Sequence, residues 1–212
     1  MTTMKHSSQA VARQAAHGCR QVRAHSHRGF TLLETLLTTI IVGLAITALV
    51  KQVFFTAQQN AWTQRVQVGT LLADNLREMM AGLPFSDPRN GTQTFGPETG
   101  ESLASFNDVD DFDGFDSATR PDIPSGQPVG VVDAARRVIT QSIGGVAQVP
   151  PEWKNWRQQI AVDPVDPNNL NTTFPKPNTT RVCVRITVTI SYQPPGTSGY
   201  QQIVQLRWLK SR

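Results

Sequence analysis

The stretch Arg28-Gly29-Phe30-Thr31-Leu32-Leu33-Glu34 decides how the rest of the chain is organised. A basic segment without acidic residues ends at its glycine, and a predominantly apolar run begins directly after it and extends to Val50. This run of about 21 residues is long enough to cross a bilayer as a helix. Its one charged side chain is Glu34, which lies near its start. An ionised carboxylate in hydrocarbon costs at least about 2.5 kcal/mol on insertion scales, so Glu34 needs a partner, a proton or a place near the interface.

The segment before the apolar run is strongly basic. Residues 1–29 carry five Lys or Arg, all four His of the chain, and neither Asp nor Glu. No apolar core precedes Gly29, so the segment differs from an ordinary secretory signal, and Cys19 lacks the apolar stretch of a lipoprotein signal. Basic residues beside a membrane span predict a cytoplasmic N-terminus and a C-terminal part outside. The alternative is a disordered extension before a plain signal anchor.

The net charge of +4 belongs mainly to this basic segment. Without residues 1–29, the chain keeps 15 Lys and Arg against 16 Asp and Glu, a net charge of −1. A nucleic-acid surface needs basic side chains gathered on a folded domain, so we expect no nucleic-acid partner. The remaining chain also has no His, which excludes Ser-His-Asp triads, Cys-His pairs and His-based zinc sites. It has no phosphate-binding loop either, so we expect no enzymatic activity.

The apolar run is predicted to continue as one long amphipathic helix. Apolar side chains recur at helical spacing on one face, at Val68, Leu72, Leu76, Met79 and Leu83. Gly82 and Pro84 are expected to end the helix. A single helix from Phe30 to Ala81 would be roughly 78 Å long at the usual rise per residue. We expect its apolar stripe to pack on the protein's own C-terminal domain rather than in a partner's groove.

Residues 84–212 are enough for one small domain with an antiparallel sheet. The part up to Pro151 is rich in Gly, Pro, Asp and Ser, which predicts loops with short elements. Apolar side chains from Val182 to Tyr192 alternate with polar ones, as in a half-buried strand. A turn at 194–199 and the alternating Val204, Leu206 and Trp208 predict its antiparallel neighbour. Trp156, Gln158, Ile160 and Val162 indicate a third strand, ended by Asp163-Pro164. The predicted fold class is α+β, with the helix covering the sheet.

Cys183 is the one cysteine that remains without residues 1–29. It therefore cannot form an internal disulfide, although an extracytoplasmic compartment would permit one. The alternation places Cys183 on the polar side of its strand. We expect a packed free thiol there rather than a reactive one.

An acidic cluster surrounds Gly114, at Asp108, Asp110, Asp111, Asp113 and Asp116. Carboxylate oxygens at such spacing suit Ca²⁺, and the first four aspartates are the candidate ligands. The EF-hand pattern does not fit, because it would place Val109 at the first ligand position and Arg120 where the bidentate Glu belongs. The alternative is a solvated acidic loop anchored by three aromatic residues, Phe106, Phe112 and Phe115. No other cofactor is expected.

The Gly29-Phe30 junction, Glu34 and the membrane span stand in the register of a known motif. They resemble the cleavage and methylation motif of type IV prepilins and type II secretion pseudopilins. The resemblance implies that prepilin peptidase cuts after Gly29 and methylates the new amine of Phe30. It also implies that Glu34 pairs with this amine on a neighbouring subunit, which would fix register rather than add much stability. The implied partners are the peptidase, other pilin or pseudopilin subunits and an inner-membrane assembly platform.

The resemblance also implies an organisation and a location. Residues 1–29 would be a cleaved cytoplasmic leader, 30–50 a transmembrane helix, 51–83 its amphipathic continuation and 84–212 a periplasmic head. The subunit would first lie in the bacterial inner membrane and then in a filament at the cell surface.

Two further features narrow the implied subfamily. Major pilins often carry a proline near the membrane exit of this helix, where the present chain has Lys51, which favours a minor pilin or pseudopilin. The segments 83–85 (Leu-Pro-Phe) and 106–114 (Phe-Asn-Asp-Val-Asp-Asp-Phe-Asp-Gly) are similar to those of minor pilins of the mannose-sensitive haemagglutinin (MSHA) type. The expected function is a subunit of a type IV pilus-like filament or its tip complex. The alternatives are a type II secretion pseudopilin and, from another class, a membrane-anchored adhesin or ligand-binding protein.

Overall fold

The computed structural model describes residues 31–212 except 90, 92, 121–122 and 124–125. Across these residues the fold is α+β, as predicted, with one long helix, one short 3₁₀ helix and six strands. The long helix α1 spans Leu32–Ala81, and the 3₁₀ helix η1 spans Asp110–Phe112. The chain divides into two compact units, one up to Lys51 and one from Gln52 to the C-terminus. The second unit therefore holds the later part of α1 together with every strand.

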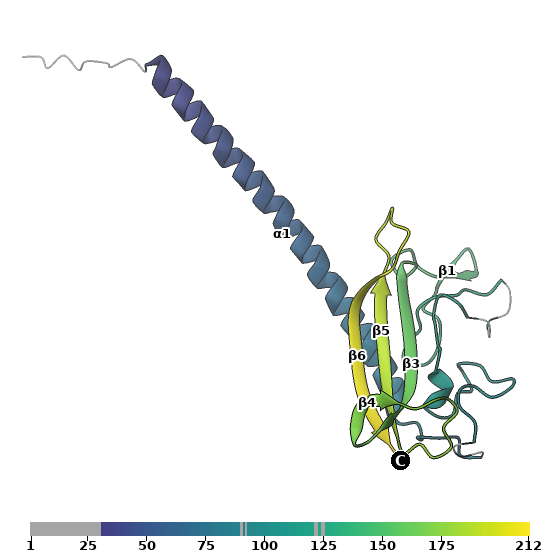
Figure 1. Ribbon diagram of the computed structural model, residues 1–212. Helices are drawn as coiled ribbons and strands as arrows, with labels where there is room; N and C mark the ends of the chain where they lie inside the picture. The colour runs from purple at the N-terminus through teal and green to yellow at the C-terminus, as the bar shows by residue number, and fades with distance from the viewer. Residues whose placement is uncertain (1–30, 90, 92, 121–122, 124–125) are drawn as a thin grey trace, which may run out of the picture. The chain divides into compact units, whose positions relative to one another are not determined.

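The main sheet contains four antiparallel strands in the order β4-β3-β5-β6. Their bounds are Trp156–Asp166 for β3, Asn169–Thr173 for β4, Cys183–Tyr192 for β5 and Gln201–Ser211 for β6. Figure 1 shows β3, β5 and β6 side by side, with β5 in the middle. The predicted hairpin is confirmed, because β5 pairs with β6 along its whole length.

Strand β3 does not end at Asp163-Pro164, so that predicted boundary is wrong. The strand continues to Asp166, and Pro164 lies opposite Val184 of β5. On the other side, pairing with β4 starts only at Val165, and the Pro164 carbonyl accepts a 2.9 Å hydrogen bond from the Phe174 N–H. Pro164, which has no N–H, thus lies just before the residue at which β3 begins to pair with the outer strand β4, and a proline is tolerated there.

The loops of residues 84–151 contain a second, two-stranded sheet, made by β1 (Gln141–Ile143) and β2 (Val146–Gln148). Gly144 and Gly145 form its two-residue turn with φ of 60° and 82°, which glycine adopts without strain. All six strand residues are exposed. Short elements are predicted in this region, but this particular hairpin is not among the predictions.

The apolar stripe of α1 packs on the main sheet, as predicted. Its fully buried residues are Gly69, Leu72, Ala73, Leu76 and Met80. The other predicted members, Val68, Met79 and Leu83, are half-buried and pack against the same core. The face of α1 that packs on the core therefore contains the small residues Gly69 and Ala73 as well as large ones.

Gly69 allows the helix to approach β6 closely. A Cβ atom at this position would lie 3.1 Å from Val204 Cγ2 and 3.2 Å from Ile203 Cγ2. Both neighbours face the helix at a bulge, since Ile190 pairs with Val204 and Ser191 pairs with Gln202, which leaves Ile203 as an extra residue. The sheet and the helix thus lie so close at Gly69 that even a Cβ would require Val204 and Ile203 to shift.

The alternation of β5 is confirmed at its centre and fails at its start. Val184, Ile186, Val188 and Ile190 are buried in the core, and their β6 neighbours Val204, Leu206 and Trp208 pack beside them. Val182 lies before the strand and is 49% exposed, while Cys183 is only 7% exposed. Cys183 is a packed free thiol, as expected, and burial raises its pKa.

Candidate functional sites

The first candidate site is the start of α1. The Glu34 N–H lies 3.0 Å from the Thr31 carbonyl oxygen and 3.3 Å from Thr31 Oγ1, so Thr31 closes the first helical turn. Further along, the hydroxyls of Thr35, Thr38, Thr39 and Thr47 donate to carbonyls three or four residues earlier, at 2.7–2.9 Å. Each hydroxyl is thereby satisfied within the helix, as a lipid-facing helix requires.

The early part of α1 is apolar and exposed. Every residue from 31 to 60 is exposed, and an 18-residue window of α1 reaches a mean hydropathy of 2.1. Among the described residues, this is the one helix long and apolar enough to cross a membrane. Glu34 is exposed here, while Gly29 and Phe30 lie outside the described residues. The cleavage site and the pairing of Glu34 with the Phe30 amine therefore stay predictions.

The second candidate site is the acidic loop, which is buried rather than solvated. Asp108, Asp110 and Asp111 are 1%, 2% and 1% exposed, so the expectation of a solvated loop is wrong for these three residues. The predicted aromatic anchors are confirmed, since Phe106, Phe112 and Phe115 are all buried in the core. The rings of Phe106 and Phe112 meet edge to face with centroids 5.0 Å apart.

Two of these aspartates shape the loop through the backbone. Asp108 Oδ1 accepts hydrogen bonds from the N–H groups of Asp110 and Asp111, at 2.9 and 3.2 Å. Asp111 Oδ2 accepts from the N–H groups of Asn107 and Asp108, at 2.8 and 3.1 Å. These four bonds satisfy backbone donors in and beside η1, which gives both buried carboxylates a structural role.

Asp110, Asp113 and Asp116 pair with cations from the sheet region. Asp110 Oδ2 lies 2.7 Å from Arg181 Nη2, and both side chains are fully enclosed. Asp113 Oδ1 lies 2.8 Å from Lys176 Nζ and accepts the Val162 N–H at 2.9 Å. Asp116 is paired with Arg157 of β3. The four predicted Ca²⁺ ligands therefore have separate partners and do not converge on one point.

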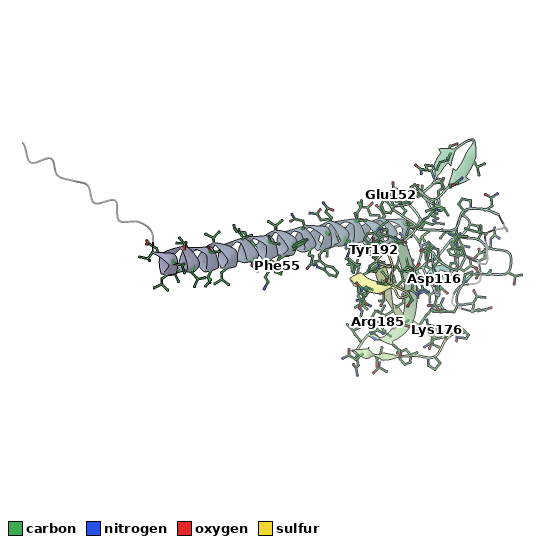
Figure 2. All side chains as sticks on the ribbon, turned by 90° about the horizontal axis from the view of Figure 1, so that it is seen from above. Phe55, Asp116, Glu152, Lys176, Arg185 and Tyr192 are labelled. Carbon is green, nitrogen blue, oxygen red and sulfur yellow. The ribbon has the colours of Figure 1, made fainter. Side chains whose placement is uncertain are left out.

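Asp163 extends this set of ion pairs along β3. It pairs with Lys176 at 3.3 Å and with Arg185 at 3.4 Å. Both cations are labelled in Figure 2, on the same side of the head. The polar side of the sheet is thus held to the surrounding loops by charge.

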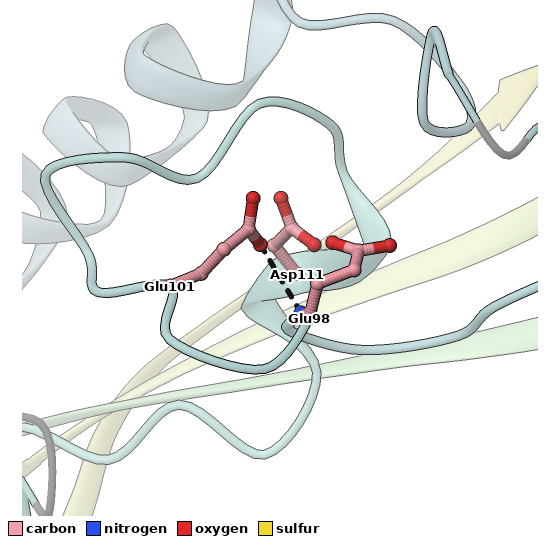
Figure 3. Close-up of side chains that lie close together, drawn as sticks. All are labelled: Glu98, Glu101 and Asp111. Carbon is pink, nitrogen blue, oxygen red and sulfur yellow. Dashed lines mark hydrogen bonds between the residues drawn. The ribbon is translucent and has the colours of Figure 1, made fainter.

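The structure brings together a different acidic group. Glu98, Glu101 and Asp111 each place one carboxylate oxygen within 4.8 Å of the others. Figure 3 shows these three side chains converging from neighbouring turns of the chain. Glu98 and Glu101 were not among the predicted ligands, because nothing in their spacing connects them with Asp111.

Burial changes the acidity of this region. It raises the pKa of Asp108 to about 7, helped by the neighbouring Asp110 charge, and it raises the pKa of Asp111 to about 7 as well. The pKa of Asp110 is also raised by burial, although Asp108 and Arg181 oppose the shift. Burial and Glu98 together raise the pKa of Glu101. Burial therefore favours the protonated forms of these carboxyl groups.

Two long-range contacts that sequence reasoning missed hold the loops to the sheet. Gln158 is fully buried in β3, and its amide exchanges two hydrogen bonds with the Val132 backbone, at 2.7 and 3.1 Å. Arg181 donates to the Thr94 carbonyl at 3.1 Å and stacks over the Phe95 ring, 4.8 Å from its centroid. Polar residues in an alternating pattern give no signal of such buried roles.

Comparison of the chain with models of protein families, with curated proteins and with solved structures finds no match in any of the three. The class of protein is accordingly defined by architecture: an α+β protein with a long apolar N-terminal helix that packs on a small antiparallel sheet. This architecture is compatible with that of pilins.

Proposed function

We propose that the protein is a prepilin that matures into a minor pilin or pseudopilin, a subunit of a type IV pilus-like filament or its tip complex. One observation carries the proposal. The Gly29-Phe30 junction and Glu34 stand at the start of a 50-residue helix that changes from fully exposed to core-packed along its length. A plain signal anchor needs the apolar span but neither the carboxylate in register nor the continuous helix into the head.

Exposed apolar residues beyond the bilayer length support assembly over simple anchoring. After Lys51, the side chains of Val53, Phe54, Phe55 and Trp62 are 47–68% exposed. Figure 2 shows Phe55 on the free surface of the helix. Large apolar side chains are rarely left in water in such a group, and neighbouring helices in a filament would cover them. Glu34, placed next to the new amine of a neighbour, would set the register of that packing.

The proposed partners and location follow from this role. Prepilin peptidase would cleave after Gly29 and methylate Phe30, and the subunit would wait in the inner membrane with its head in the periplasm. An inner-membrane platform and other pilin or pseudopilin subunits would then take it into the filament. Lys51 at the membrane exit favours a minor pilin or pseudopilin over a major pilin, and the segment 106–114 favours the MSHA type among these.

Replacing Glu34 by Ala tests the assembly role directly. We expect normal cleavage and membrane insertion but loss of incorporation into the filament, measured by immunoblotting of membrane and sheared-filament fractions. Glu78→Ala is the matched control, because Glu78 is an exposed acid on the same helix outside the apolar run. Incorporation of Glu34→Ala at the level of Glu78→Ala would rule out this role of Glu34.

A further inference from the structure

We propose that Glu98, Glu101 and Asp111 bind a Ca²⁺ ion that ties the segment of residues 98–101 to η1. The site does not depend on the proposed function. It shares only Asp111 with the four ligands that the sequence pattern indicated, since Asp108, Asp110 and Asp113 are engaged elsewhere.

The spacing of the three carboxylates suits Ca²⁺. Their facing oxygens all lie within 4.8 Å of one another. A Ca²⁺–oxygen distance of about 2.4 Å places opposite ligands about 4.8 Å apart, so oxygens within this limit can bind one Ca²⁺, and Ca²⁺ accepts an irregular set of ligands whereas Mg²⁺ demands a nearly ideal octahedron. Three oxygens at this separation can therefore surround one Ca²⁺ with little movement, and water can complete its coordination. Figure 3 shows the three carboxylates close together.

A buried, unpaired oxygen of Asp111 is a second observation that points to a ligand. Its side chain is 1% exposed, and although Oδ2 accepts two backbone hydrogen bonds, Oδ1 is buried without a hydrogen-bond partner. Glu98 Oε2 and Asn107 Oδ1, close to the same group, are likewise buried and unpaired. A polar oxygen left unpaired in the interior is costly. A hard cation bound between the three carboxylates is a partner that removes this cost.

The distribution of charge around Glu98, Glu101 and Asp111 also favours a cation as the ligand. Three nearby acids have a cation of their own, Arg181 for Asp110, Lys176 for Asp113 and Arg157 for Asp116, while Asp108 accepts backbone N–H groups. No ion pair between described residues involves Glu98, Glu101 or Asp111. Asn107 Nδ2 donates to Glu101 Oε1 at 3.1 Å, but an amide carries no charge. The group thus brings three acidic side chains together, with Arg120 as the cationic side chain that lines the same cavity.

The group is also accessible to an ion from solvent. Glu101 and Asp111 line a cavity of about 430 Å³, together with Phe106, Phe115 and Arg120. Arg120 stacks on the Phe115 ring, 5.4 Å from its centroid. The cavity leaves room for a hydrated cation and its remaining water ligands.

The test uses the full-length protein in detergent micelles, stripped with EDTA and titrated with Ca²⁺ near neutral pH. A site with a Kd of about 10⁻⁴–10⁻³ M is typical of extracellular Ca²⁺ modules, and at about 10 mM Ca²⁺ it raises the melting temperature by about 5 °C. Isothermal titration calorimetry measures the affinity, and tryptophan fluorescence follows unfolding. Mg²⁺ at the same concentration should give less than half of this rise.

Two variants and one control distinguish these three ligands from the other acidic residues of the loop. Glu98→Gln and Glu101→Gln should each weaken Ca²⁺ binding at least about tenfold and cut the rise in melting temperature to about half or less, because a carboxylate oxygen is lost. Both variants leave the backbone bonds of Asp111 in place, and a glutamine at position 101 keeps a side-chain oxygen to accept the Glu98 N–H that Glu101 Oε2 accepts at 3.1 Å. Asp113→Asn, a neutralised acid on the same cavity, should keep the response. The proposal is overturned if the unmodified protein shows no rise, if Mg²⁺ matches Ca²⁺, or if Glu98→Gln and Glu101→Gln respond like the unmodified protein.

Discussion

The Arg181–Asp110 pair is the contact whose loss should damage the head most. Both side chains are enclosed, with exposures of 0% and 3%, and Nη2 lies 2.7 Å from Oδ2. Arg181→Met keeps most of the apolar stem but leaves the Asp110 carboxylate buried without its cation. Breaking a buried pair on one side costs about 3–5 kcal/mol, against a total unfolding free energy of about 5–15 kcal/mol for a typical domain.

The decrease in unfolding free energy caused by Arg181→Met should depend on pH and on whether residue 110 is still an aspartate. The pKa of Asp110 is already raised by burial, and removal of Arg181 takes away one of the effects that hold it down. The carboxyl can then take up a proton, so Arg181→Met should cost less near pH 5 than near pH 8. The double variant with Asp110→Asn should recover about 1–3 kcal/mol of the loss, because no buried charge remains.

Urea unfolding of the full chain in detergent micelles, followed by tryptophan fluorescence, measures these differences. Arg137→Met is the matched control, because Arg137 pairs with Asp133 at 3.4 Å while its side chain is 78% exposed. An exposed pair of this kind is worth less than about 1 kcal/mol. The reasoning is refuted if Arg181→Met is no more destabilising than Arg137→Met, or if the double variant is no more stable than Arg181→Met alone.

Two further predictions concern the helix–sheet contact and the acidic loop. Gly69→Leu should destabilise the head by at least about 1–3 kcal/mol, since no side chain fits against Val204 and Ile203. The control Thr70→Leu, on the exposed side of the helix, should have little effect. Equal urea midpoints for the two variants would contradict the close approach of helix and sheet. Asp108 and Asp111 have a pKa of about 7 in the fold against about 4 when unfolded, so the folded state holds more protons between these values. The unfolding free energy should therefore fall as pH rises from about 4 to about 7 in EDTA, and Asp108→Asn should flatten this slope. A melting temperature independent of pH over this range would show that the two acids are not perturbed.

Periodicity predicted the elements that carry large apolar side chains. Leu72 and Leu76 identified the core side of α1, and the alternation from Val184 to Ile190 identified the central strand. Gly69 and Ala73 were missed because small residues add little to a hydrophobic pattern, although they are where the helix comes closest to the sheet. That approach depends on the β6 bulge at Ile203, which no spacing in the sequence reveals.

The ends of elements depended on contacts rather than on pattern. Pro164 is typical of the end of a strand, but a proline beside an outer strand that pairs only later does not interrupt the sheet. The β1–β2 hairpin does have a signal in the sequence, a Gly144-Gly145 pair between the β-branched residues Ile143 and Val146. A two-glycine turn of this kind is enough to predict a hairpin at this position.

The acidic loop shows most clearly what spacing cannot supply. Its aspartates were correctly expected to lie beside buried phenylalanines, but their partners come from far along the chain. Arg181 is 71 residues from Asp110, and Lys176 is 63 residues from Asp113. Which carboxylates remain without a cation is decided only by the tertiary fold, and these turn out to include Glu98 and Glu101.

The proposed role rests on processing at the junction between Gly29 and Phe30, and one measurement tests it most directly. The protein is expressed together with a prepilin peptidase, purified from membranes, and its N-terminus is determined by mass spectrometry of the intact chain and of its N-terminal peptide. We predict a mature chain that begins at N-methylated Phe30 and lacks residues 1–29. A chain that retains Met1, or that is cut elsewhere, would contradict the account.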